Sequence, residues 1–175
     1  MPVFIALLRA VNVGGTGKLA MCDLKLICER AGFKRVKTYI ASGNVVFSSG
    51  KTEAQVKAAL ESGLAAHAGK PVGVLVRTAV EMQSVLSQNP FKNAPANRTV
   101  AIFLDAPPPS DAASAAVGQQ TEIIVLGQRE LYVFYGEGMA SSKLRIPVAK
   151  AGTARNMNTV AKLVDIATKL AECRD

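Results

Sequence analysis

Basic and amide side chains beside two glycines form the most promising chemical feature near the start of the chain. Arg9, Asn12 and Lys18 surround the pair Gly14 and Gly15, between an apolar run and a predicted helix. Glycines let backbone N–H groups approach an anion that the helix dipole also favours. The spacing matches neither the P-loop nor the three-glycine dinucleotide fingerprint. The segment is therefore either a phosphate-binding turn or a flexible connection.

A second group of this kind precedes the last predicted helix. Arg155 stands beside the helix start, where Thr153 or Asn156 can cap the helix near its positive end. Lys143 lies in the same stretch, residues 138–164, which contains no acidic residue. The pattern favours an anion site, with an ordinary cap beside a solvated arginine as an equal alternative.

A third candidate is the tight connection between two predicted strands. Ser42 and Asn44 flank Gly43 and can present two small polar groups at the same sheet edge as the other candidates. Asn and Gly also belong to turns for conformational reasons alone. The turn interpretation is the favoured one for these residues.

Catalytic constellations are not evident in the sequence. His67 is the only histidine, which excludes histidine-rich metal sites, and its place near a predicted helix end is typical of a surface residue. No carboxylate pair has a spacing that indicates acid–base work. The sequence therefore predicts no metal site, and it leaves the catalytic residues and any cofactor unassigned.

The charge balance indicates an anionic partner. The 175 residues carry 21 lysines and arginines against 13 acids, a formal net charge of +8. Residues 30–52 contain five basic residues and no acid. A balance this basic favours nucleotides or nucleic acid as partners. The alternative is a charged surface that serves solubility only.

Apolar residues make up 49% of the chain, enough for a buried core. The longest apolar runs fall far short of the roughly 20 residues that span a bilayer. No basic leader with a cleavage site precedes the first apolar run, and the three cysteines have no disulfide or metal-ligand spacing. We therefore expect a cytoplasmic protein with no membrane partner.

Periodicity in the first half predicts the order strand, helix, strand, strand, helix, strand. The strands are expected at residues 3–8, 36–40, 45–48 and 72–77, and the helices at 21–31 and 52–68. This order is that of the ferredoxin-like, or α-β plait, fold, in which helices cover one face of a four-stranded sheet. The predicted fold class is α+β.

The second half follows a short helix at residues 78–86 and a hinge near 89–96. It shows a strand at 100–104, an alanine-rich helix at 110–117, a hairpin of strands 122–126 and 130–135, and a final helix from Met157. We therefore predict two plait subdomains, residues 1–88 and 97–175. The second is similar to the first but has no evident closing strand.

Long motifs resemble a known bacterial family, domain of unknown function 1697. They are Leu7 to Gly15 with Lys18 and Met21, Gly32-Phe33, Thr38 to Phe47, Ser142 to Leu144, and Thr153 to Leu163. The resemblance covers essentially the whole chain and implies two α-β plait subdomains, with no established activity. Ala10, Ala41 and Met157 depart from the family pattern, and the loss of a tryptophan at Met157 weakens any proposal of base stacking there.

Three functions remain open at this level. The leading hypothesis is a binding module whose basic groove holds a phosphate-bearing ligand, a nucleotide or nucleic acid, through Arg9, Lys18, Lys143 and Arg155. The first alternative is an enzyme acting on a small phosphorylated substrate, against which the missing general base counts. The second is an interaction or oligomerisation module that uses a sheet edge, with the oligomeric state unknown.

Overall fold

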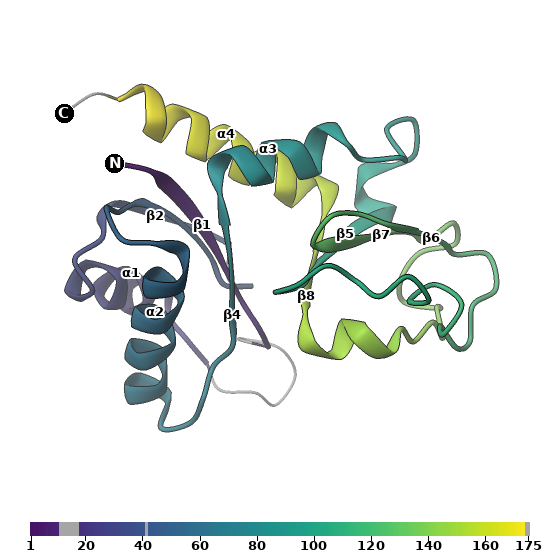
Figure 1. Ribbon diagram of the computed structural model, residues 1–175, viewed down its shortest axis with the longest axis horizontal. Helices are drawn as coiled ribbons and strands as arrows, with labels where there is room; N and C mark the ends of the chain where they lie inside the picture. The colour runs from purple at the N-terminus through teal and green to yellow at the C-terminus, as the bar shows by residue number, and fades with distance from the viewer. Residues whose placement is uncertain (11–17, 41, 174–175) are drawn as a thin grey trace. The chain divides into compact units, whose positions relative to one another are not determined.

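The computed structural model describes residues 1–10, 18–40 and 42–173 (Figure 1). In this part of the chain the protein is a mixed α/β protein with two four-stranded antiparallel sheets and four α-helices. The elements in chain order are β1 (Val3–Leu8), α1 (Met21–Arg30), β2 (Lys34–Tyr39), β3 (Asn44–Ser48), α2 (Glu53–Ala68), β4 (Val74–Thr78), α3 (Ala79–Ser87), η1 (Ala96–Arg98), β5 (Thr99–Phe103), β6 (Ile123–Leu126), β7 (Glu130–Phe134), η2 (Pro147–Ala151), β8 (Thr153–Asn156) and α4 (Met157–Glu172).

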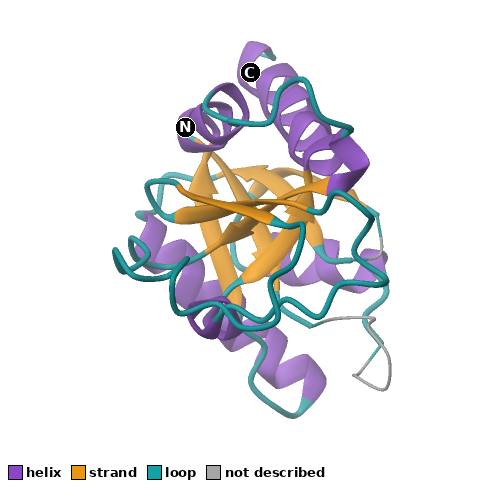
Figure 2. Cartoon of the chain, turned by 90° about the vertical axis from the view of Figure 1, so that its right-hand side faces the viewer, coloured by secondary structure: helices purple, strands orange, loops and turns teal. Residues whose placement is uncertain are grey.

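The chain divides into two compact units, Met1–Gln83 with Lys162–Asp175, and Ser84–Ala161. The predicted hinge at residues 89–96 lies within the second unit, and the last part of α4 belongs to the first. Figure 2 distinguishes the helices, strands and loops of the chain by colour. Within the described residues, no helix combines the length and apolarity that crossing a membrane requires.

The first unit is built on a sheet with the strand order β2-β3-β1-β4. All six residues of β1 are buried, as the continuous apolar run predicts for a central strand covered on both faces. Helices α1 and α2 pack against one face of this sheet (Figure 1), where Phe4, Phe47 and Leu60 belong to one apolar core. The predicted order of elements in this half is confirmed.

Helix α2 shows why the local prediction succeeded. Thr52 accepts a hydrogen bond from the Gln55 backbone N–H, and the Gln55 side chain accepts one from the Thr52 N–H. This capping box fixes the start of the helix. Gly69 ends it in the left-handed region, at a φ of 71°, where residues with a Cβ are strained.

The second unit has a sheet with the strand order β6-β7-β5-β8. The predicted hairpin is confirmed as β6 and β7, which pair in antiparallel register from Ile123 with Phe134 to Leu126 with Leu131. A closing strand is also present, because β8 pairs with β5 along Thr153 to Asn156. This strand is not evident from the sequence, since these four residues lack the apolar alternation of a half-buried strand.

The predicted helix at residues 110–117 is wrong. The segment forms successive turns, in which the Ala112 N–H donates to the Pro109 carbonyl and the Ala115 N–H to the Asp111 carbonyl. It lies between Pro109 and Gly118, whose φ of 74° ends any helix. A stretch this short forms too few helical hydrogen bonds to offset the free-energy cost of helix nucleation. Val117 instead forms an antiparallel β-bridge with Arg145.

Candidate functional site

The predicted glycine-rich site is only partly described. Asn12, Gly14 and Gly15 lie outside the described residues, while Arg9 and Lys18 are on either side of them. The Arg9 N–H donates to the Gly73 carbonyl at 2.9 Å. The Arg9 side chain lies so close to Gly73 that a Cβ there would stand 2.9 Å from its Cδ. Gly73 therefore gives Arg9 the space to lie along β4.

Ser42 and Asn44 are brought together, in a structural arrangement. The Asn44 Nδ2 donates to the Ser42 Oγ at 3.0 Å and to the Tyr39 carbonyl at 2.9 Å. Asn44 is fully buried, and Gly43 has a φ of 87°, which favours glycine. These contacts close the connection between β2 and β3, as the turn interpretation expects.

The three candidates in the second unit have different surroundings. Lys143 is exposed, whereas Arg155 is 8% exposed on β8. The Arg155 Nη1 donates to the Thr153 Oγ1 at 2.7 Å and to the Ala154 carbonyl at 2.9 Å. Burial lowers the pKa of Arg155 to about 10, so it still carries its charge at neutral pH.

Asn156 caps the final helix. Its Oδ1 accepts a hydrogen bond from the Thr159 N–H at 2.9 Å, which satisfies one of the free donors in the first turn of α4. Between the two cap residues that the sequence proposed, the structure gives this role to Asn156. The Thr153 hydroxyl accepts from Arg155 instead.

A small cavity on the first unit gathers basic side chains around an apolar floor. We call it the basic hollow; its volume is about 210 Å³, and it is lined by Ala10, Lys18, Leu19, Leu64, His67, Ala68, Lys70 and Val72. The three charged or titratable lining residues are Lys18, His67 and Lys70. No carboxylate lines it among the described residues. Such surroundings suit an anion that carries a small apolar group.

Among these basic residues, the sequence patterns indicate only Lys18 as a site residue. The place of His67 near a helix end predicts a surface residue, and no motif points to Lys70. A signal was present, because His67 and Lys70 bracket Gly69, the residue that ends α2. The sequence does not show that the C-terminal end of α2 lies beside Lys18, the residue shortly before α1, in the folded protein.

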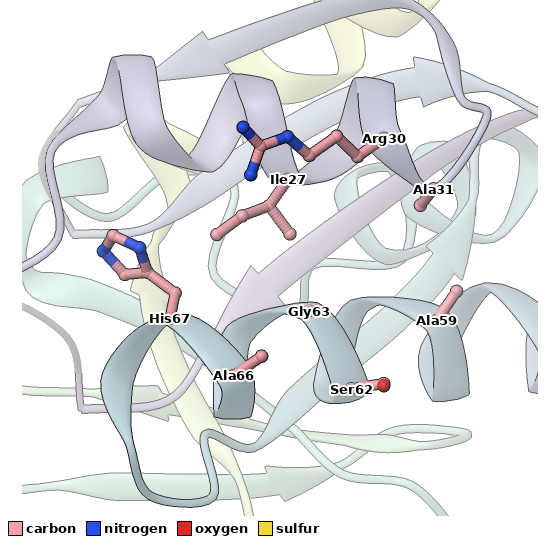
Figure 3. A pocket seen from close by; sticks show the side chains of 8 residues that line it. All are labelled: Ile27, Arg30, Ala31, Ala59, Ser62, Gly63, Ala66 and His67. Atoms are coloured by element: carbon pink, nitrogen blue, oxygen red, sulfur yellow. The ribbon is translucent and has the colours of Figure 1, made fainter.

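A wider groove between α1 and α2 shares His67 with the basic hollow. It encloses about 470 Å³ and is lined by Ile27, Arg30, Ala31, Ala59, Ser62, Gly63, Ala66 and His67. Figure 3 shows Arg30 and His67 on the two facing helices, with Ile27 and Gly63 between them. Gly63 keeps the helices close, because a Cβ there would stand 2.7 Å from the Ile27 Cγ2.

His67 has one acidic neighbour. Its Nε2 lies 3.9 Å from the Asp23 Oδ2 on α1. Both side chains are substantially exposed, so this ion pair contributes little to stability. The imidazole itself lines both the hollow and the groove.

The N-terminal end of α1 adds hydrogen-bond donors nearby. Its N-cap residue is Ala20, which offers no side-chain acceptor to the first turn. The N–H groups of Met21 and Cys22 have no acceptor within the described part of the chain. Met21, the first of the two, is only two residues after Leu19, which lines the hollow. Free donors at a helix start favour an anion over a cation.

The family assignment rests on comparison with known sequences. The sequence profile of the family described as "Protein of unknown function (DUF1697)" matches residues 1–132. The chain belongs to this family. The resemblance seen in the sequence motifs is thus confirmed over residues 1–132, and the function of the DUF1697 family is unknown. No curated protein matches the chain.

A solved structure is similar to this DUF1697 protein over almost its whole length. It is described as "The structure of conserved bacterial protein SP0830 from Streptococcus pneumoniae". The TM-score is 0.77, the sequence identity is 23%, and the match covers 95% of this chain and 98% of that one. At this identity the likeness shows the fold alone.

Proposed function

We propose that this protein is a binding module for a phosphate-bearing ligand, and that the basic hollow of the first unit receives the phosphate. The observation that carries the proposal is the set Lys18, His67 and Lys70 around one cavity that has no carboxylate among its described lining residues. Ammonium groups and free backbone N–H groups bind phosphate through charge-assisted hydrogen bonds. The overall charge of +8 supports an anionic ligand as well.

The dimensions favour a mononucleotide or a similar small phosphate ester. The hollow alone, at about 210 Å³, is smaller than most pockets for organic ligands. The adjoining groove of about 470 Å³ offers room beyond His67 for the rest of the ligand, with Arg30 and the apolar Ile27 on its wall. A single-stranded nucleic acid is the larger version of the same proposal.

The experiment is a calorimetric titration with inorganic phosphate, adenosine monophosphate and a short thymidine oligonucleotide at moderate salt, about 0.1 M. The test protein is the double variant Lys18→Met with Lys70→Met. A matched control, Lys37→Met with Lys51→Met, removes the same charge from the same unit away from the hollow. We expect about a tenfold or greater loss of affinity in the test variant, because the loss of both ammonium groups together should cost about 1.4 kcal/mol or more.

The control should bind within about threefold of the unmodified protein, which is the size of a general charge effect at moderate salt. An equal loss in both double variants would show that only net charge matters. Absence of binding by all three probes would remove the proposal. Tighter binding of the oligonucleotide with a steep salt dependence would favour nucleic acid over the nucleotide.

An enzyme acting on a small phosphorylated substrate is favoured by one observation. His67 lines the hollow, and the Asp23 carboxylate lies 3.9 Å from its Nε2, close enough for a small side-chain movement to bring the two into hydrogen-bond contact. Release of phosphate from a chromogenic phosphate monoester tests it. Activity that is lost in His67→Gln and retained in the lysine control variant supports catalysis; binding without turnover supports the module.

We infer the finer fold assignment as well: each unit is a ferredoxin-like plait. The support in the first unit is its order β1-α1-β2-β3-α2-β4 with the sheet order β2-β3-β1-β4. The second unit has the equivalent sheet order β6-β7-β5-β8 and replaces the two crossover helices with turns. It is an incomplete version of the same plait.

A further inference from the structure

Strand β6 forms an edge of the sheet in the second unit and carries no charge. Its four residues are Ile-Ile-Val-Leu, and Ile123 is 49% exposed. Natural sheets protect such edges with charged residues, bulges or covering segments, because a free edge pairs with another chain. An uncharged edge strand such as β6 therefore needs some other form of protection.

The hydrogen-bond pattern of the hairpin identifies the free backbone groups of β6. The Gly127 N–H donates to the Glu130 carbonyl, and bonded pairs then recur at every second residue, at Val125 and Ile123. The N–H and C=O groups of Ile124 and Leu126 consequently point away from β7. Within the described part of the chain these groups have no hydrogen-bond partner.

The edge strands at the opposite ends of the two sheets, β4 and β8, differ from β6 because side chains bind their outward carbonyls. On β4, the Val74 carbonyl accepts from Lys57 and the Val76 carbonyl from Arg77, each at 2.9 Å. On β8, the Ala154 carbonyl accepts from Arg155 at 2.9 Å. Side chains thus cover the outward carbonyls of both strands, which leaves less for another strand to bind.

The remaining edge, β2, is protected by charge and irregularity. Lys34 and Lys37 are exposed on it, and the register with β3 shifts between them. Arg35, inside this bulge, has a φ of 52°. Lysines and a bulge both oppose edge-to-edge pairing. Compared with the other edges, β6 has only its shortness as protection.

We propose that β6 pairs with β6 of a second copy of this chain, in antiparallel orientation about a two-fold axis at Val125. Only this register joins the free groups to each other, because Ile124 of one copy then faces Leu126 of the other, twice. Four backbone hydrogen bonds result. The β6-β7-β5-β8 sheets of the two copies then form one continuous eight-stranded sheet. A symmetric pairing of one strand with itself is the usual geometry of a closed dimer.

The ends of the seam are defined by contacts already present. The Glu122 carbonyl accepts from the Gln119 side chain, and the Gln128 N–H donates to the Glu130 carboxylate. These groups are engaged within the monomer. The pairing therefore stops after Ile124 and Leu126 on each side.

Side chains along this register are compatible with self-pairing. The exposed Ile123 faces Gly127 of the other copy, which has no side chain in the way. Glu122 faces Gln128, and Thr121 faces Arg129, so like charges do not meet across the seam. Neither shape nor charge therefore opposes a second copy, and the match of the free backbone groups favours it as the occupant.

The test is sedimentation equilibrium of the full chain from about 5 µM to about 1 mM, because a seam this short predicts a weak dimer with a dissociation constant on the order of 100 µM. Val125→Lys places two like charges opposite each other at the axis and should leave only monomer. Val117→Lys is the matched control, since Val117 is 63% exposed in the same unit and outside the seam. It should dimerise like the unmodified protein.

Amide hydrogen exchange of the unmodified protein provides a second readout that needs no variant to fold. The amides of Ile124 and Leu126 should be protected several-fold more at the high protein concentration than at the low one, whereas the Val125 amide should not change. Monomer mass throughout the concentration range overturns the proposal. A dimer that survives Val125→Lys, or whose Ile124 and Leu126 amides exchange equally at both concentrations, overturns it too.

Discussion

The two sheets of this protein share one strand order and differ in what covers them. Strands β1, β2, β3 and β4 of the first unit correspond in order and direction to β5, β6, β7 and β8 of the second. In the first unit α1 follows the first strand and α2 the third; in the second unit turns and η2 occupy these places. The same strand order is therefore formed in one unit with crossover helices and in the other without them.

The difference appears in the size of the two apolar cores. Helices α1 and α2 supply Leu24, Ile27 and Leu60 to the first core, together with the aromatic stack of Phe33 on Phe47. The second core is smaller, and loop residues such as Ala112 and Ile146 cover it. Helices bring long apolar side chains at regular spacing, whereas turns bring few.

The closing strands show that the resemblance extends to single residues. Arg77 on β4 pairs in register with Ile5, and Arg155 on β8 with Ala101 of the corresponding strand. Each arginine is buried and donates to the carbonyl of the residue before it. The next residue then caps the following helix: Thr78 for α3 and Asn156 for α4.

Cavities in the two cores should have the largest and most unequal effects. Leu60→Ala and Leu131→Ala remove the same atoms from fully buried positions in the first and second core. Each should lower the free energy of unfolding by about 2–5 kcal/mol, with Leu60→Ala at the upper end because packed helices relax less than loops. Urea unfolding measures both. A larger loss for Leu131→Ala would contradict this view of the covers.

Arg77→Lys and Arg155→Lys test whether the two arginines are equivalent. Lysine keeps the charge but lacks the planar fork, so the carbonyls of Val76 and Ala154 lose their donor. Each variant should lose about 1–3 kcal/mol of stability, the cost of a buried acceptor without a partner. Thermal unfolding followed by circular dichroism is the measurement. A loss in one variant alone would end the equivalence.

At alkaline pH, one buried titrating group in each unit should lower the stability of the protein, each over a different pH range. Burial raises the pKa of the Cys28 thiol from its ordinary 9 to about 12, and burial also raises the pKa of the Tyr132 hydroxyl well above its ordinary 10. Both groups are neutral in the folded state, so the unfolded chain releases their protons first and stability falls as pH rises. Loss should begin near pH 9 through Cys28 and steepen above pH 10 through Tyr132.

The Cys28 contribution should be about 1.4 kcal/mol per pH unit between roughly pH 9 and 11. Cys28→Ala removes this slope and leaves the part due to Tyr132. Urea unfolding at a series of pH values measures the slope. An unchanged slope in Cys28→Ala would show that another group governs alkaline unfolding.

The smallest expected effects come from the two equivalent helix caps. Thr78→Ala removes the acceptor of the Glu81 N–H, and Asn156→Ala that of the Thr159 N–H. Each should cost about 1 kcal/mol, which corresponds to a fall of roughly 2–4 °C in the melting temperature. Serine at either position should restore most of the loss. Failure of serine to restore it would mean that the side chains stabilise something other than the cap.

The elements of the first unit could be predicted because local signals agreed there. The apolar run Val3 to Leu8, the Thr52 cap with Gln55, and the left-handed Gly69 each act over a few residues. The second unit followed less well. Its alanine-rich segment 110–117 has helix-forming composition without the length to nucleate, and β8 exists only because β5 offers a partner.

The candidate site divides in the same way. The sequence by itself indicated the family, the order of elements in the first unit, and the role of Ser42 and Asn44 as turn residues, because those depend on neighbours in the chain. Tertiary structure decided that Lys18, His67 and Lys70 line one hollow and that Arg155 is buried, with its guanidinium donating to the Ala154 carbonyl. Side chains distant in sequence meet only when helices and strands pack, and no local preference specifies that meeting.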